Sequence, residues 1–293
     1  GPDKFLPHLL GHEAGATVLE IGADVTHVAP GDRVVCHWRP GAGIDAGGVV
    51  YKWKGRDVNA GPITTFQKYA VVSENRLTKV PPDTDFELCC LLADTLTTGF
   101  GIINNDAKLK AGESVVIFGV GGIGLGVVLG AKLAGANPII GVDLHDHKLA
   151  KAAEYGLTHT INASREKADE RVMEILSGLA DVTIDGTGNP KVIETAYDLA
   201  KLRGGRCVLF GVMPSDQRVS IHTLPLHFGR VLTGSEGGQS QPDKDIPEIL
   251  RVLAEKKIDW RGFVSHWGRL RTLNADLSEM RSGAVTHLLL DFN

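Results

Sequence analysis

The chain has 293 residues, of which 31 are basic and 35 are acidic, so its formal net charge is −4 with histidine neutral. This length suffices for two packed domains, and the charge argues against a general affinity for nucleic acid or for an anionic membrane surface. With 43% hydrophobic and 23% charged residues, the composition is that of a globular protein and excludes a disordered one.

The first third of the chain predicts an irregular β domain. Before residue 105, short apolar runs are interrupted by glycine, proline and aspartate, which is typical of short strands and turns. The predicted strands are 16–21, 33–36, 66–73 and 77–80. The segment 37–48 (HWRPGAGIDAGG) has no periodicity and predicts a long loop.

After residue 105, predicted strands and helices alternate. The strands are 114–118, 138–142, 158–162, 182–185, 207–211 and 230–234, and the helices are 122–134, 147–155, 165–176 and 190–202. This alternation predicts right-handed crossovers and an α/β fold with a parallel, doubly wound sheet. The longest uncharged run, 114–131, is broken by glycines and therefore predicts a buried strand, turn and helix, not a membrane span. Helices at 245–256 and 274–282 and a strand at 286–292 follow.

A glycine-rich motif, Gly119-Val120-Gly121-Gly122-Ile123-Gly124, follows the first strand of this region and opens its first helix. Such a motif in this context indicates a dinucleotide-binding turn. Gly119 makes the tight turn, Gly121 lets the backbone approach the pyrophosphate, and Gly124 allows close packing of helix and strand. The free N–H groups at the helix N-terminus then face the phosphates.

Asp143 lies 19 residues after Gly124, at the end of the second strand. Its carboxylate would accept hydrogen bonds from a ribose diol and repel a 2′-phosphate, which favours NAD over NADP. Lys148 lies five residues further on and could reach the ribose edge. The alternative is that Asp143 is an ordinary N-cap of the next helix.

Two further motifs give the chain a family resemblance. Gly11-His12-Glu13 precedes a strand, and Pro30-Gly31-Asp32-Arg33-Val34 follows it. Together with the glycine motif and Thr97-Thr98-Gly99, they resemble the medium-chain dehydrogenase/reductase superfamily, in its zinc-containing alcohol and polyol dehydrogenase branch. The resemblance implies a partial GroES-like catalytic domain over 1–95, a Rossmann NAD-binding domain over 96–238 and a return to the catalytic domain over 239–293.

By this resemblance, His12 aligns with a catalytic zinc ligand and Glu13 with the neighbouring acid that approaches the metal. Asp94 falls where the family usually has a Cys or Glu ligand, and a carboxylate is an acceptable zinc ligand. From the residues alone, a hydrogen-bonded His–Glu pair and a helix-capping Asp94 remain alternatives.

The chain departs from the family at three places. Ten residues precede Gly11, and the upstream Cys that is normally the first zinc ligand is absent, so we expect the catalytic zinc to be weakly held or missing. The loop 37–48 has none of the four cysteines of the structural zinc lobe, which predicts no structural zinc. His287 replaces a phosphate-binding arginine and would weaken one pyrophosphate contact.

The resemblance also implies which residues contact the nicotinamide. Thr98 packs against the ring, and Ile123 lies behind it. The backbone contacts are assigned to Phe210, Val212, Ser235 and Gly237. The substrate is a small alcohol or carbonyl compound whose identity stays open, because the aromatic residues Trp38, Tyr51 and Trp53, with His37, suit polyols, sugars and aryl alcohols alike.

The predicted function is hydride transfer between an alcohol carbon and nicotinamide, assisted by zinc. Two alternatives remain: a zinc-free reductase of the same superfamily and a non-catalytic nucleotide-binding protein. The four cysteines show no disulfide framework, which predicts a cytoplasmic protein. The strand near 230–238 ends the sheet, and an edge strand of this kind favours a homodimer, or a tetramer made from two dimers.

Overall fold

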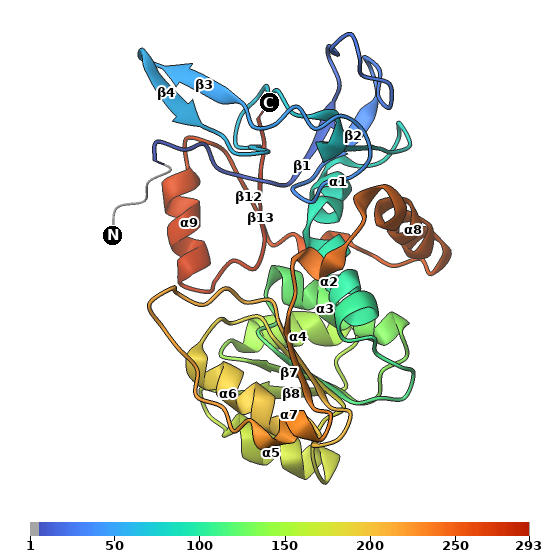
Figure 1. Ribbon diagram of the computed structural model, residues 1–293, viewed down its shortest axis with the longest axis vertical. Coiled ribbons are helices and arrows are strands. Elements are labelled where there is room, and N and C mark those ends of the chain that lie inside the picture. Colours follow the sequence, from blue (N-terminus) through green and yellow to red (C-terminus); the bar gives the residue numbers. More distant parts are fainter. Residues whose placement is uncertain (1–5, 293) are drawn as a thin grey trace. The chain divides into compact units, whose positions relative to one another are not determined.

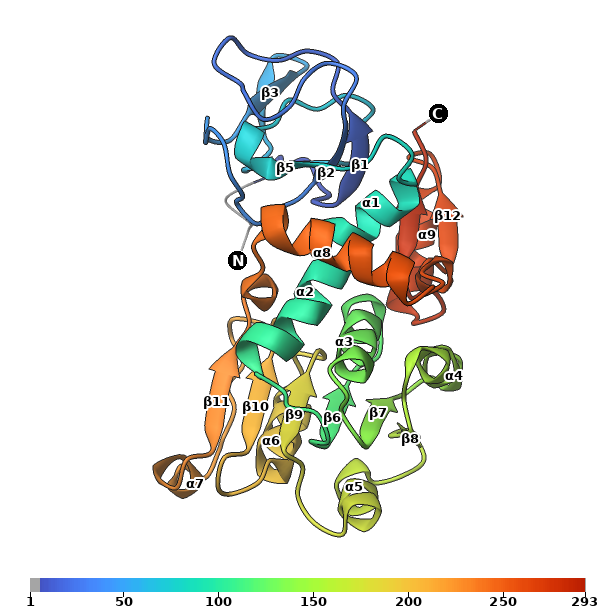
Figure 2. The same cartoon turned by 90° about the vertical axis from the view of Figure 1, so that its right-hand side faces the viewer.

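The computed structural model describes residues 6–292 (Figures 1 and 2). The chain divides into two compact units. The flanking unit combines Gly1–Thr97 with Gln241–Asn293, and the central unit is Thr98–Ser240. Each unit has its own core and its own sheets.

The central unit is built on one six-stranded sheet with the order β11-β10-β9-β6-β7-β8, in which each neighbouring pair is parallel. The strands are β6 (Val115–Phe118), β7 (Ile139–Asp143), β8 (His159–Asn162), β9 (Val182–Asp185), β10 (Arg206–Leu209) and β11 (Val231–Gly234). The helices are α3 (Gly122–Leu133), α4 (Asp146–Tyr155), α5 (Ala168–Leu176), α6 (Pro190–Leu199) and α7 (Leu224–His227). Helices cover both faces of the sheet in Figure 2, which confirms the predicted doubly wound α/β fold.

The core of the central unit is apolar on both sides of its middle strands. Every residue of β6 is buried, as expected for a parallel strand covered on both faces. On one side, the inward residues of β6, β7 and β8 pack with α5 and α6 around Tyr197, whose ring is fully buried and whose hydroxyl donates to the carbonyl of His222. This rigid sheet fixes where its strands end, and those ends carry the candidate cofactor residues.

The flanking unit contains three small sheets. Its antiparallel sheet has the order β1-β2-β5, a hairpin pairs β3 with β4, and β12 pairs in parallel with β13. The strands are β1 (Ala14–Thr17), β2 (Arg33–Cys36), β3 (Val50–Trp53), β4 (Arg56–Asn59), β5 (Leu77–Lys79), β12 (His266–Gly268) and β13 (Leu288–Leu290). The helices are α1 (Phe86–Ala93), α8 (Pro242–Glu255) and α9 (Leu273–Arg281). Residues from both ends of the chain thus build one unit.

Short helical segments complete both units. The helix α2 (Thr95–Gly101) leads from the flanking unit into the central one and continues as a π-helical segment at Ile102–Asp106. The 3-10 turns are Glu74–Arg76, Gly237–Gln239 and Arg261–Phe263.

The predicted strand at 66–73 is wrong. No strand is assigned to these residues, and Tyr69 and Val71 are both about two-thirds exposed. These two apolar side chains alternate with other residues along the chain, but they are not buried in a core. The Val71 N–H donates to the Tyr51 hydroxyl, not to a neighbouring strand. An alternating pattern predicts a strand only where one face is buried.

The long loop between β2 and β3 has no regular secondary structure, as predicted, and carboxylates hold it in place. Glu74 accepts backbone hydrogen bonds from Thr26, His27 and Ile44 at 2.6–2.9 Å. The bonds from His27, Ile44 and Thr26 lower the pKa of Glu74, because they stabilise its ionised form. One buried carboxylate therefore joins two loops.

Among residues 6–292, no single helix is long and apolar enough to cross a membrane; the bent pair Phe86–Ala93 and Thr95–Asp106 reaches the required length and composition only when taken together. All four cysteines are free thiols.

Candidate functional site

The glycine motif lies at the carboxyl end of β6, where it turns into α3. Gly119 has φ +86°, a conformation that favours glycine. A Cβ on Gly124 would lie 2.1 Å from the Gly119 carbonyl oxygen, whereas a Cβ on Gly121 would meet nothing within 4 Å. The loop is thus closed on its inner side and open at Gly121, so its backbone can be approached by a phosphate group at the start of α3.

Asp143 ends the neighbouring strand β7 and contacts this loop. Its Oδ2 accepts from the Val120 N–H at 3.1 Å, and its Oδ1 accepts from the His145 N–H at 3.1 Å. The N-cap residue of α4 is His145, so the alternative that Asp143 is that N-cap is wrong. Each carboxylate oxygen retains acceptor capacity for a diol. Lys148 lies on the first turns of α4, partly buried.

The remaining candidate cofactor residues of the central unit follow adjacent strands. Phe210 and Val212 come directly after β10, and Ser235 and Gly237 come directly after β11. Because the strands are parallel, these segments lie at the same edge of the sheet as the glycine motif, the edge at which such sheets bind ligands. Thr98 is buried, and its carbonyl oxygen lies near Gly238.

In the flanking unit, His12 and Asp94 lie side by side although 82 positions separate them. His12 precedes β1, Asp94 lies between α1 and α2, and the distance from His12 Nε2 to Asp94 Oδ2 is 3.2 Å. The hydrogen bond to Asp94 raises the pKa of His12 against the opposing effect of burial. The imidazole is half exposed, whereas the carboxylate is largely buried.

Glu13 has other hydrogen-bond partners than that pair. Its Oε1 accepts two hydrogen bonds from Thr95, from the backbone N–H and from the hydroxyl, both at 3.1 Å. Its Oε2 lies 3.9 Å from His287 Nε2. Burial raises the pKa of Glu13, while His287 lowers it. The structure therefore places His287 beside Glu13, in the flanking unit, and its assignment to the pyrophosphate stays a prediction.

Sequence reasoning did not include Thr95. Any residue type can donate through its backbone N–H, so this contact could not be identified from the residue at position 95. The 82 positions between Thr95 and Glu13 also match no helix or strand periodicity. The only available signal was its position directly after Asp94. Two consecutive residues, His12 and Glu13, thus contact two other consecutive residues: His12 contacts Asp94, and Glu13 contacts Thr95.

The donor pair fits part of a zinc site. Two atoms bound to one tetrahedral zinc at about 2.1 Å lie about 3.4 Å apart, close to the 3.2 Å between His12 Nε2 and Asp94 Oδ2. In the described part of the chain, no group of three or more His, Cys, Asp and Glu side chains is arranged to hold a metal. His12 and Asp94 are brought together as donors, and the structure does not bring Glu13 into a three-residue set with them.

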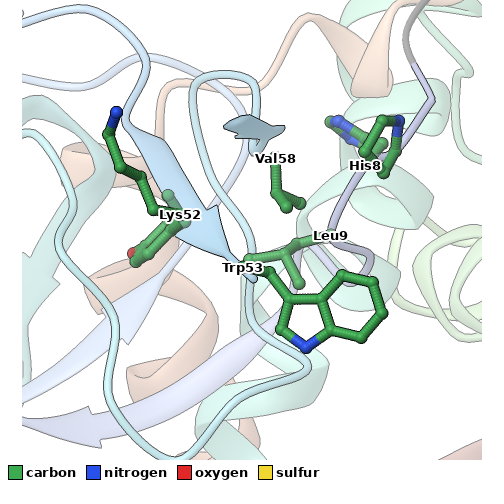
Figure 3. A pocket seen from close by; sticks show the side chains of 7 residues that line it. His8, Leu9, Lys52, Trp53 and Val58 are labelled. Atoms are coloured by element: carbon green, nitrogen blue, oxygen red, sulfur yellow. The ribbon is translucent and has the colours of Figure 1, made fainter. Parts of the chain in front are cut away.

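A separate pocket of about 430 Å³ lies between the hairpin and the N-terminal segment (Figure 3). It is lined by Pro7, His8, Leu9, Tyr51, Lys52, Trp53 and Val58. His37 does not line it: its ring is fully buried and contacts the Arg39 carbonyl and the Thr78 hydroxyl. The prediction that His37 joins Trp38, Tyr51 and Trp53 in one substrate wall is therefore wrong for His37, and Trp38 does not line this pocket either.

Comparison with known proteins gives consistent results for both units. Residues 2–82 match the alcohol dehydrogenase GroES-like domain, and residues 122–255 match the zinc-binding dehydrogenase family. The chain is 33% identical to alcohol dehydrogenase class-3 of Cereibacter sphaeroides and 32% identical to S-(hydroxymethyl)glutathione dehydrogenase of Paracoccus denitrificans, in each case over 96% of this chain and 84% of the relative. Benzyl alcohol dehydrogenase from Acinetobacter calcoaceticus superposes with a TM-score of 0.88 at 26% identity, over 98% of this chain and 85% of that one.

Proposed function

This chain belongs to the zinc-containing alcohol dehydrogenase branch of the medium-chain dehydrogenase/reductase superfamily and is an alcohol dehydrogenase-like oxidoreductase, and on that premise we propose that it is a zinc-dependent, NAD-linked dehydrogenase of alcohols or polyols. The three relatives named above act on alcohols, S-(hydroxymethyl)glutathione and benzyl alcohol, so a small molecule with a primary or secondary hydroxyl is the proposed substrate.

The observation that carries this proposal is the pair of donor atoms at 3.2 Å on His12 and Asp94. These two atoms form a hydrogen bond when no metal is bound, and both belong to ligand types that zinc accepts, which supports a zinc-dependent member of the superfamily. The partly exposed imidazole leaves one side of the pair accessible to a substrate.

Each candidate residue then has a distinct task. When bound, zinc supplies Lewis acidity toward an alcohol oxygen and NAD supplies the hydride acceptor. His12 and Asp94 hold the metal, and Glu13 braces both of them through Thr95. Asp143 orients the adenosine ribose, while the N–H groups at the start of α3 bind the pyrophosphate.

The proposal is tested by assaying NAD reduction with benzyl alcohol and with S-(hydroxymethyl)glutathione, using the full chain supplied with zinc. We expect turnover with NAD, little with NADP, and loss of turnover when a chelator removes the metal. Replacing Asp143 by alanine is expected to lower kcat/KM for NAD about ten- to hundredfold, because a charged hydrogen bond contributes about 1.5–3 kcal/mol. The same change removes the repulsion of a 2′-phosphate, so discrimination against NADP relaxes.

Asp146→Ala is the matched control for this change. Asp146 lies three residues after Asp143, at the start of α4, but its carboxylate pairs with Arg165 and Asn162, so its loss is expected to leave the cofactor preference unchanged. An Asp143→Ala chain with the cofactor preference of the wild type contradicts the assignment of NAD. A wild-type chain that reduces neither cofactor contradicts the proposed function itself.

We also propose that the chain forms homodimers, or tetramers made from two dimers, through the edge strand β11. This strand ends the six-stranded sheet, and Val231 on it and Phe228 just before it are both about half exposed. Val231→Lys is expected to dissociate the assembly, since an edge lysine opposes strand pairing. Met173→Lys, an exposed position on α5, is the control. Light scattering that finds a wild-type monomer at high micromolar concentration contradicts the proposal.

A further inference from the structure

A fully buried carboxylate, Asp185, ends the strand β9 in the middle of the central sheet. In the register of the sheet it lies beside Phe118 on β6 and beside Leu209 on β10, because β9 runs between these two strands (Figure 2). The segment directly after β6 carries the glycine motif, and the segment directly after β10 carries residues assigned to the nicotinamide. Asp185 therefore lies between the two halves of the proposed cofactor site.

The side chain of Asp185 holds the turn that follows β9. Its Oδ1 accepts from the Thr187 N–H at 3.2 Å and from the Thr187 hydroxyl at 2.6 Å, and its Oδ2 accepts from the Gly188 N–H at 3.0 Å. Burial raises the pKa of Asp185, whereas these bonds lower it, because they stabilise the ionised form. A buried carboxylate is costly without such donors, so the side chain and the turn stabilise each other.

This turn packs against both neighbouring segments. A Cβ on Gly119 would lie 3.3 Å from Thr187 Cγ2, which places the turn beside the glycine motif. On the other side, a Cβ on Gly188 would lie 2.6 Å from the Val212 carbonyl oxygen. The turn thus fills the space between the two segments and sets the distance between them.

The two segments depend on the turn to different degrees. The glycine motif has a second support, since Asp143 accepts from the Val120 N–H at 3.1 Å. The ring of Phe210 packs on the turn itself, because a Cβ on Gly186 would lie 2.1 Å from Phe210 Cζ. A displaced turn would therefore move the segment after β10 more than it moves the glycine motif.

We propose that Asp185 is a positioning residue which, by holding the turn Gly186–Gly188, sets the place of the nicotinamide half of NAD relative to the pyrophosphate half. The inference rests on the proposed function in that NAD binds at this edge of the sheet, with Phe210 and Val212 at the nicotinamide. Loss of the carboxylate then weakens the binding of intact NAD more than the binding of ADP-ribose, which lacks the nicotinamide.

The test compares the affinities of the full chain for NAD and for ADP-ribose by calorimetric titration. In Asp185→Asn, one acceptor oxygen replaces two, so the side chain cannot accept from Thr187 and Gly188 together. We expect the affinity for NAD to fall at least about tenfold relative to that for ADP-ribose, because hydrogen bonds to a charged group are among the stronger ones.

Asp181→Asn is the matched control, since Asp181 directly precedes the same strand at its other end. Its carboxylate also accepts from a backbone N–H and a hydroxyl, those of Ser114, and it also pairs with Lys201. This change is expected to lower the melting temperature and to leave the ratio of the two affinities unchanged.

A second pair of variants covers failure of Asp185→Asn to fold, which circular dichroism detects. Thr187→Val keeps the shape of the side chain and removes its hydroxyl, so it should lower the ratio at least about threefold, and Thr187→Ser, which keeps the hydroxyl, should restore it. A ratio that stays at the wild-type value in Asp185→Asn or in Thr187→Val overturns the inference and leaves the dehydrogenase proposal standing. A wild-type chain that binds neither ligand overturns both.

Discussion

Replacing Gly124 by alanine is expected to weaken NAD binding about ten- to hundredfold and to lower the melting temperature. The added Cβ would lie 2.1 Å from the Gly119 carbonyl oxygen, a backbone atom that cannot rotate away. Either α3 moves off β6 or the turn opens, and both changes displace the N–H groups that we propose bind the pyrophosphate. Overpacking of this kind costs about 1–3 kcal/mol of folding stability, and misplaced N–H groups lose charged hydrogen bonds worth about 1.5–3 kcal/mol, which corresponds to the expected change in affinity. Calorimetric titration with NAD and thermal unfolding measure the two effects.

The variant Gly121→Ala is expected to change NAD affinity without changing the stability of the fold. A Cβ at this position meets nothing within 4 Å in the protein, so the melting temperature should stay at the wild-type value. NAD binding should still weaken, because the methyl group occupies the space through which the pyrophosphate approaches the backbone. A Gly124→Ala chain that binds NAD like the wild type, or a Gly121→Ala chain that does so, shows that the pyrophosphate lies elsewhere.

The central unit was largely predictable from the sequence because its signals are local and repeated. Buried parallel strands are continuous apolar runs, and each helix between them ends near a glycine or begins near a proline or a polar residue. β9 has the predicted bounds, and α3 begins at the predicted residue. The largest errors in bounds are at helix ends: α5 starts at Ala168, three residues later than predicted, and α6 stops at Leu199, three residues earlier. The strand β10 also ends two residues before its predicted end, and the short helix α7 was not predicted. The charged residues at the predicted start of α5 and the apolar residues at the predicted end of α6 carry no capping signal.

The flanking unit was less predictable because its strands are short and its pairings are non-local. The hairpin β3–β4 was missed: its turn residues Lys54 and Gly55 have positive φ values, but Lys-Gly is a weaker hairpin signal than Asn-Gly. The helix α1 was missed as well, since its eight residues form an apolar run that periodicity cannot assign to helix or strand.

The candidate site residues could be identified from sequence motifs, whereas their arrangement in space is known only from the structure. The glycine motif and Asp143 are readable because the turn and the strand that carry them are adjacent in the chain. The convergence of His12 and Asp94 was implied by family resemblance alone, and the contact of Glu13 with Thr95 was not anticipated. Such contacts depend on how β1 packs against the junction of α1 and α2, which no local pattern specifies.

Acidification is expected to destabilise the chain through His37, in the core of the flanking unit. Burial lowers the pKa of this imidazole from its ordinary 6.5 to about 4, and the nearby Arg76 acts in the same direction while the Arg39 carbonyl and Asp243 oppose it. Between these values the unfolded chain binds a proton that the folded chain excludes, so stability is complete above the unfolded pKa and is lost as the pH falls toward the folded one. From about pH 7 to about pH 4.5, the free energy of unfolding should fall by about 2–3 kcal/mol from this group.

His37→Asn isolates the contribution, because an asparagine amide can still donate to the Arg39 carbonyl, as the ring nitrogen Nδ1 does at 2.7 Å, but does not titrate. Urea unfolding of both chains across this pH range gives the difference between their free energies of unfolding. Carboxylates such as Glu74, whose contributions to stability decrease at lower pH, affect both chains equally and cancel in this difference. The variant is expected to be less stable than the wild type near neutral pH, since Thr78 loses its partner at Nε2, and to lose less stability on acidification. If the free energies of unfolding of the two chains change with pH in the same way, the pKa of this imidazole is the same in the folded and the unfolded chain. The charge of Asp243 and the bond to the Arg39 carbonyl would then offset the effect of burial.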